Sequence, residues 1–191
     1  NRATAGRMDP DDAAWFVDGL IMRKGLTVIW VGWQFDVPVK GDNLTIEVPV
    51  AHKPNGDPIT GLVRSDWVVD QPTHTLKLGH RDQIGYPVMD PNHPDHVLTM
   101  RHGRTGKRIE VPRSRWEFAR MKDGEKQESD RYIYMEEGFE AGWIYELVYR
   151  SCDPPVVGLG PAAIRDIISY AKYNPEALFP VQKGIAAGVS Q

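Results

Sequence analysis

The sequence has little of what marks disulfide-rich, membrane or nucleic-acid-binding proteins. Cys152 is the only cysteine in 191 residues, which excludes an intrachain disulfide framework and a cluster of thiolate metal ligands. No apolar run approaches the roughly 18 residues that span a bilayer. The N-terminal Asn1–Thr4 lacks the apolar core of a signal peptide. A net charge of −3 gives no electrostatic reason to expect nucleic acid as a partner.

The composition is that of a globular chain, with 41% hydrophobic and 26% charged residues. Asp9 and Pro10 are typical of a helix start, and Gly25 is typical of the residue after a helix end. The run Leu26–Val31 that follows is β-branched and aromatic on both faces, which predicts a buried strand of a parallel sheet. Gly32–Asp36 then form the loop at the carboxyl end of that strand, where open α/β sheets bind ligands.

The residue pattern changes between residues 37 and 140, where short apolar runs alternate with clusters of proline, glycine, asparagine and aspartate. These runs predict strands at Leu44–Val48, Gly61–Val69, Thr75–Leu78, Val97–Met100, Arg108–Val111 and Tyr132–Glu136. The charged stretch Met121–Arg131 is predicted to be a solvated loop. We therefore interpret residues 37–140 as a β-rich insertion.

After the insertion, the sequence again has a pattern typical of alternating strands and helices. Trp143–Tyr149 reads as a strand, and a helix is predicted from Pro161 to about Asn174. The helix carries an apolar stripe opposite a polar one; the stripe consists of Ala163, Ile164, Ile167, Ile168 and Ala171. Lys183–Val189 reads as a last, small-residue strand. The predicted fold class is α/β, with a mostly parallel sheet, flanking helices and the β-rich insertion.

The chain ends in Gly188-Val189-Ser190-Gln191, after the predicted last strand. A glycine two residues before a serine on a strand-to-helix turn is the pattern of a nucleophile elbow, in which the turn lifts the serine hydroxyl above the sheet. The residue two positions after the serine, which must also be small, falls beyond Gln191. Ser190 is thus a candidate nucleophile.

Three segments resemble the mostly bacterial "alpha/beta hydrolase domain" family of the α/β-hydrolase superfamily. They are Lys24–Val37, a wider stretch made of Gly138–Tyr149, Pro154–Gly160 and Ala163–Asp166, and Gly184–Gln191. The resemblance implies a partial α/β-hydrolase fold and a serine hydrolase, esterase-like, that acts on a small-molecule ester-like substrate through an acyl-enzyme without a cofactor or metal.

The same resemblance implies roles for individual residues. Ser190 would be the nucleophile and the backbone N–H of Gln191 one oxyanion donor, with the second donor from Trp33 or Gln34. The alternative is that Trp33 only lines a wall. The triad acid and histidine follow the serine in this fold, so residues 1–191 are expected to be an incomplete domain. It would be inactive alone and would need the remainder of its own polypeptide.

Three other patterns have both a structural and a functional interpretation. His93 and His96 near Asp90 suggest a metal site, but the prolines around them favour a solvated turn. His102–Arg108 is a basic, glycine-bearing stretch that favours a hairpin turn, with contact to an anionic substrate as the alternative. Glu146 lies in a predicted strand, where a buried carboxylate would have a raised pKa and suggest a functional role, and the alternative is a solvent-side or paired position.

A second hypothesis comes from a different class of function. Six tryptophans in 191 residues are compatible with a non-catalytic binding protein whose β-rich region presents aromatic side chains to a saccharide or another polymer. Independently of this hypothesis, Asp66, Trp67 and Asp70 could line a pocket in the insertion, although aromatic residues in strands usually pack in a core.

Overall fold

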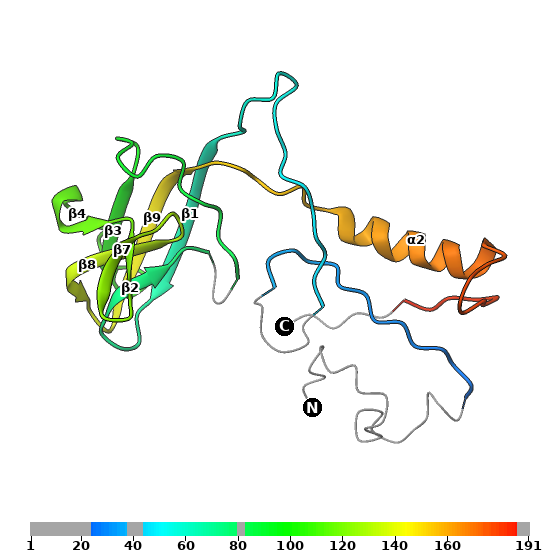
Figure 1. Ribbon diagram of the computed structural model, residues 1–191. Coiled ribbons are helices and arrows are strands. Elements are labelled where there is room, and N and C mark those ends of the chain that lie inside the picture. Colours follow the sequence, from blue (N-terminus) through cyan, green and yellow to red (C-terminus); the bar gives the residue numbers. More distant parts are fainter. Residues whose placement is uncertain (1–23, 38–43, 80–82, 187–191) are drawn as a thin grey trace. The chain divides into compact units, whose positions relative to one another are not determined.

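The computed structural model describes residues 24–37, 44–79 and 83–186. The chain divides into two compact units, one formed by Pro49–Pro155 and the other by Asn1–Val48 with Val156–Gln191. We call them the β unit and the helical unit and describe each by itself (Figure 1).

The regular elements of the β unit are antiparallel strands and one short 3₁₀ helix. Its elements are β1 (Gly61–Val68), β2 (Thr73–Lys77), β3 (Val97–His102), β4 (Ile109–Val111), η2 (Arg113–Arg115), β5 (Trp116–Glu117), β6 (Ala119–Lys122), β7 (Glu125–Glu128), β8 (Tyr132–Phe139) and β9 (Trp143–Ser151). They form a four-stranded sheet in the order β1-β9-β3-β4, a three-stranded sheet in the order β2-β8-β5, and the β6–β7 hairpin.

One hydrophobic core joins the inner faces of the two larger sheets. Strand β9 contributes one face to this core. Its Tyr145, Leu147 and Tyr149 are almost completely buried, while the residues between them are more exposed. Successive side chains of a strand point to opposite faces, so this period of two turns one face of β9 inward. From the three-stranded sheet, Ile133 and Phe139 are fully buried in the same core.

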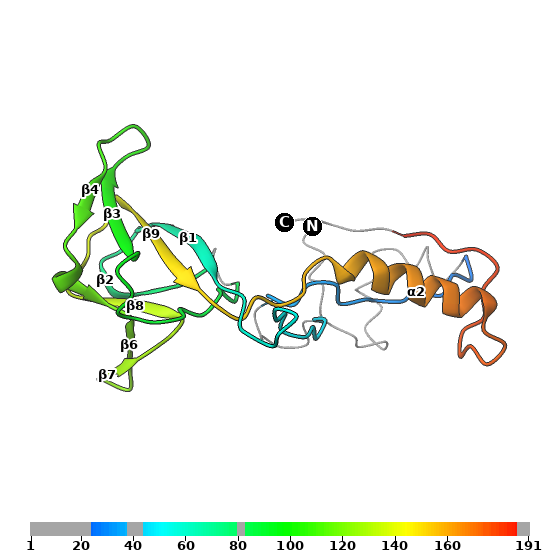
Figure 2. The same ribbon diagram turned by 90° about the horizontal axis from the view of Figure 1, so that it is seen from above.

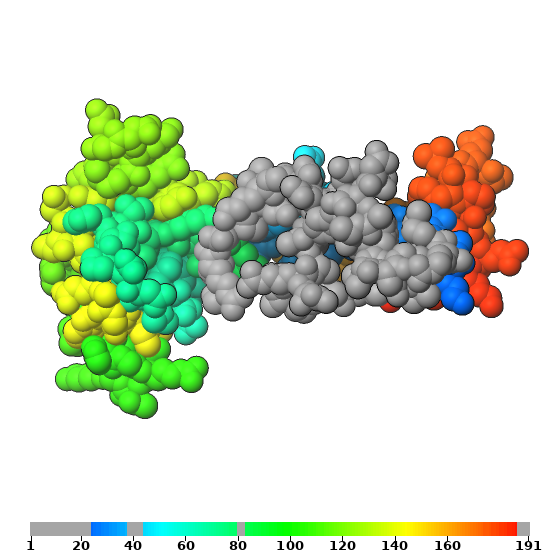
Figure 3. Space-filling model, turned by 90° about the horizontal axis from the view of Figure 1, so that it is seen from below, coloured from blue at the N-terminus to red at the C-terminus, as the bar shows by residue number. Residues whose placement is uncertain are grey.

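The β6–β7 hairpin corrects the prediction of a solvated loop at Met121–Arg131. Its two-residue turn is Asp123-Gly124, and both residues have positive φ, at 54° and 83°. A turn with two positive φ angles matches the twist of antiparallel strands, and the Asp-Gly pair favours it. The hairpin projects from the opposite side of the β unit to the β3–β4 turn (Figures 2 and 3). Charge alone had suggested a loop, but the turn chemistry decided the structure.

The helical unit contains α2 (Leu159–Tyr173), which confirms the predicted helix. Arg165, Asp166 and Lys172 are exposed, whereas the apolar stripe is partly buried. Gly160 at the first turn packs directly on the backbone of Trp33, because a Cβ there would lie 2.4 Å from the Trp33 carbonyl oxygen. No helix in the described part of the chain is long and apolar enough to cross a membrane.

The predicted α/β fold class, a partial α/β-hydrolase with a mostly parallel sheet and flanking helices, is wrong. Every pair of strands in the described residues is antiparallel. Strand β9, predicted as a parallel strand, lies between β1 and β3 in the centre of an antiparallel sheet. A short apolar run is compatible with several kinds of strand, and only its partners decide which forms.

The two other strands of the predicted parallel sheet are not found where the structure can be described. Leu26–Val31 is extended but forms no strand, and Leu26 and Trp30 are more than half exposed. A β-branched run becomes a strand only where a partner satisfies its backbone groups. Residues 183–186 form no strand either. The predicted N-terminal helix before Gly25 and the end of the predicted last strand lie outside the described residues.

Candidate anion-binding face

Trp33 and Gln34, two of the three predicted oxyanion-hole residues, lie in a segment of the helical unit that forms neither helix nor strand. The Gln34 carbonyl oxygen accepts hydrogen bonds from the Ile46 N–H at 3.1 Å and from Thr45 Oγ1 at 2.8 Å. The Trp33 side chain is half exposed. Ser190 and Gln191 lie outside the described residues. Their roles therefore stay predictions, as do the amide roles of Trp33 and Gln34 and the incomplete domain over residues 1–191.

The histidine pair of the β unit forms a turn that is held by its own hydrogen bonds. His96 Nε2 lies 2.6 Å from the Asp90 carbonyl oxygen, and His96 Nδ1 lies 3.3 Å from the Arg150 N–H. Since a backbone N–H only donates, Nδ1 is the acceptor and Nε2 carries the proton. The described residues include no group of three or more His, Cys, Asp or Glu able to hold a metal ion.

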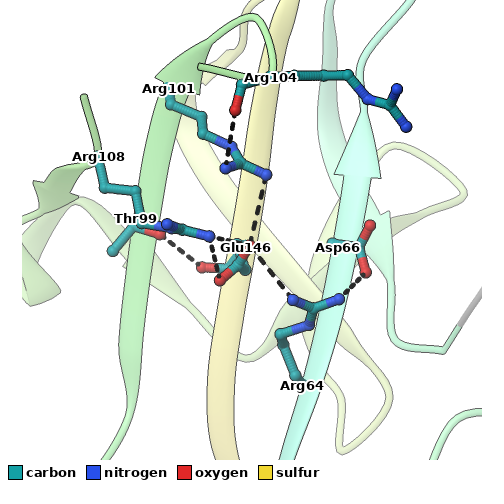
Figure 4. Close-up of polar contacts among 7 residues, drawn as sticks. All are labelled: Arg64, Asp66, Thr99, Arg101, Arg104, Arg108 and Glu146. Carbon is teal, nitrogen blue, oxygen red and sulfur yellow. Dashed lines mark hydrogen bonds and ion pairs between the residues drawn. The ribbon is translucent and has the colours of Figure 1, made fainter. Parts of the chain in front are cut away.

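The strongest cluster of charged groups lies on the outer face of the four-stranded sheet. The Glu146 carboxylate on β9 is contacted by three arginines: Arg108 Nη2 at 3.2 Å, Arg64 Nη1 at 3.7 Å and Arg101 Nη2 at 3.8 Å. Figure 4 shows these guanidinium groups converging on Glu146 from the two neighbouring strands and the β3–β4 turn. We call Arg64, Arg101, Arg108 and Glu146 the arginine face.

Strand register brings these residues together. Glu146 pairs with Asp66 on β1 and with Thr99 on β3. Arg64 and Arg101 are each two residues from those partners along their strands, so all these side chains project from the outer side of the sheet. Arg108 comes from the end of the β3–β4 turn, which confirms the hairpin predicted for the basic stretch His102–Arg108.

Positive charge exceeds negative charge in this cluster. Arg64 also pairs with Asp66 at 3.2 Å, so the contacts join three guanidinium groups to two carboxylates. Arg101 donates from Nη1 to the Arg104 carbonyl oxygen at 3.3 Å, while its Nε is buried with no hydrogen-bond partner among the described residues. An arginine offers five N–H donors in a planar fork that matches a carboxylate. The buried Nε is out of reach of an external anion, but the half-exposed guanidinium groups of Arg64 and Arg108 have further N–H donors on the surface.

On the buried side of the β unit, by contrast, burial favours the uncharged forms of three titratable side chains. Burial raises the pKa of Tyr149 to about 12, and its hydroxyl donates to the Tyr86 carbonyl oxygen at 2.7 Å. Burial also lowers the pKa of His96, which favours the neutral imidazole. The pKa of the Cys152 thiol is raised, chiefly by burial. A protonated thiol is a poor nucleophile.

Sequence analysis found part of the arginine face. A paired position was one of the alternatives for Glu146, and contact with an anion was the alternative to a hairpin turn for the His102–Arg108 stretch. Neither was connected with Arg64 or Arg101. The missing information was the register of β1, β9 and β3, which the sequence does not contain.

Comparisons with known proteins give no family for this chain. A scan against models of protein families finds no match. No curated protein and no solved structure matches it either. The absence of a family match and the antiparallel sheets show that the resemblance to the "alpha/beta hydrolase domain" family was wrong. The description of the chain as a bacterial α/β-hydrolase is wrong for the same reason.

Proposed function

We propose that the β unit is a non-catalytic binding module whose arginine face takes an acidic segment of a partner protein. The observation that carries the proposal is the convergence of three guanidinium groups on the single Glu146 carboxylate. Glu146 shows that a carboxylate fits there, and the half-exposed guanidinium groups of Arg64 and Arg108 retain N–H donors for a second one.

The surroundings of the cluster favour a polypeptide over a free phosphate or a saccharide. Val68 is 65% exposed on β1 and Val97 is 37% exposed on β3. Both lie on the outer side of the sheet, beside the arginines. Protein interfaces combine arginine with apolar contacts in this way.

Among the described residues, the tryptophans of the β unit do not form an exposed aromatic surface of the kind that stacks on a saccharide. Trp116 is buried in the core, and Trp67 and Trp143 pack against it. The Trp67 indole N–H donates to the Lys77 carbonyl oxygen at 2.8 Å. The proposal keeps the idea of a non-catalytic binding protein but places recognition on charge rather than on stacking.

Binding of poly-glutamate to the whole chain tests the proposal. We expect binding that weakens as salt screens the charges and that falls about tenfold or more when Arg64, Arg101 and Arg108 are all changed to glutamine. The matched control changes Arg115, Arg120 and Lys122 to glutamine, which alters the net charge equally away from the arginine face. Equal losses in both triple variants, or no binding by the unaltered chain at low salt, would refute the proposal.

The serine-hydrolase hypothesis stays a prediction without support from the described residues. It is tested independently of the binding proposal by turnover of small activated esters. Ser190→Ala is expected to abolish turnover in a protein that contains this chain, and unchanged turnover would remove Ser190 from any mechanism.

A further inference from the structure

Strand β1 forms one edge of the four-stranded sheet in the part of the chain that the structure describes. It pairs with β9 along Gly61–Val68, and no second strand pairs with it among the described residues. Edge strands in natural proteins are usually protected by charged side chains, especially lysine, by proline, bulges or shortness, or by a covering helix or loop. The two charges of β1, Arg64 and Asp66, have opposite signs and contact each other. Strand β1 has eight residues, contains neither lysine nor proline, and keeps a regular register with β9.

The ladder between β1 and β9 shows which backbone groups remain free. The Val69 N–H donates to the Trp143 carbonyl oxygen at 3.1 Å, and this pair continues the register of Trp67 with Tyr145. In an antiparallel ladder, alternate residues direct both backbone groups to the same neighbour. The odd-numbered residues therefore bond β9, and Leu62, Arg64, Asp66 and Val68 present their N–H and C=O groups to the free edge.

These four residues also carry exposed side chains. Leu62 is 56% and Val68 is 65% exposed, and the side chains of Arg64 and Asp66 are 57% and 44% exposed. Two exposed aliphatic residues beside a row of unpaired backbone groups are the features of a strand that pairs with another chain.

The sequence of this edge is complementary to itself when read in the opposite direction. About Ser65 as the centre, Arg64 stands opposite Asp66, and Leu62 stands opposite Val68. An antiparallel pair of two β1 strands in this register would thus place opposite charges across from each other twice, with an aliphatic pair at each end. Cross-strand pairs of these kinds stabilise antiparallel sheets.

We propose that two copies of this chain associate through β1, antiparallel and centred on Ser65. Arg64 of one copy and Asp66 of the other exchange backbone hydrogen bonds and form an ion pair, and Leu62 and Val68 pair in the same way. The two-fold axis stands perpendicular to the sheet, which is the isologous arrangement expected of a homodimer. This contact satisfies the free backbone groups of all four residues.

The dimer goes beyond the proposed binding function but would strengthen it. The two four-stranded sheets become one continuous sheet, so both arginine faces lie on the same side of it. An acidic segment long enough to reach both would bind with higher avidity than either face gives alone.

A charge-swap experiment tests the contact, with the whole chain and without any polymer. The association constant is measured by sedimentation equilibrium from about 1 µM to about 1 mM. Arg64→Asp and Asp66→Arg each place like charges opposite each other twice, and we expect each to weaken dimerisation about tenfold or more. The double variant Arg64→Asp/Asp66→Arg restores opposite charges and is expected to restore the dimer.

Arg120→Asp on the β6–β7 hairpin is the matched control for Arg64→Asp, with the same change of charge and no expected effect on dimerisation. Circular dichroism of each variant shows that the fold is retained. A chain that stays monomeric at every concentration would overturn the proposal, as would single variants that dimerise normally or a double variant that is not rescued. Because no polymer is present, these outcomes are independent of whether the arginine face binds acidic segments.

Discussion

The two faces of strand β9 show how one strand serves two purposes. On its inner face, Tyr145, Leu147 and Tyr149 are almost fully buried in the core. On its outer face, Glu146 is surrounded by arginines from other segments. Adjacent residues thus meet opposite physical demands, since the inner side excludes charge and the outer side concentrates it. Three predictions test this difference.

The largest loss of stability is expected from a substitution on the inner face of β9. Leu147→Ala removes a fully buried side chain and should lower the free energy of unfolding by about 2–5 kcal/mol. Val148→Ala, the neighbouring residue on the outer face, should cost clearly less because Val148 is only partly buried. Urea denaturation of both variants gives the comparison. Equal losses would show that the two faces are not packed differently.

An intermediate effect is expected when charge is forced into the buried side at His96. Burial lowers the folded-state pKa of His96, so the unfolded chain binds the proton more readily. Stability should therefore fall as pH drops below about 6.5, with a slope approaching about 1.4 kcal/mol per pH unit. Protonation of Nδ1 would also break its bond with the Arg150 N–H.

His96→Gln removes the titrating group, so its free energy of unfolding should change less between pH 7.5 and 5.5 than that of the unaltered chain. Thermal or urea unfolding at both pH values measures the difference. His74→Gln is the control on β2, since this histidine is exposed. A His96→Gln variant with the full pH dependence would show that another group is responsible.

The smallest effect on stability is expected from the arginine face itself. Arg108 is half exposed, so Arg108→Ala should change the free energy of unfolding by about 0–1 kcal/mol, the range of exposed ion pairs. The same variant should weaken the binding of poly-glutamate. A large loss of stability with unchanged binding would mean that the arginines serve only to hold the sheet together.

Prediction from sequence succeeded where the local pattern was sufficient. The stripe from Ala163 to Ala171 identified α2, and turn residues separated most strands of the β unit. It failed for the β6–β7 hairpin, although Asp123-Gly124 was visible as a turn signal. It failed for Leu26–Val31 because apolar composition does not reveal whether a partner strand exists.

The sequence by itself determined the helix, the positions of most strands and the alternation that makes β9 two-sided, because these depend on neighbours in the chain. Only the tertiary structure decided that the sheets are antiparallel and that Arg64, Arg101 and Arg108 meet at Glu146. Register and strand order are set by contacts between distant segments, and a shift of one residue would have turned Glu146 into the core.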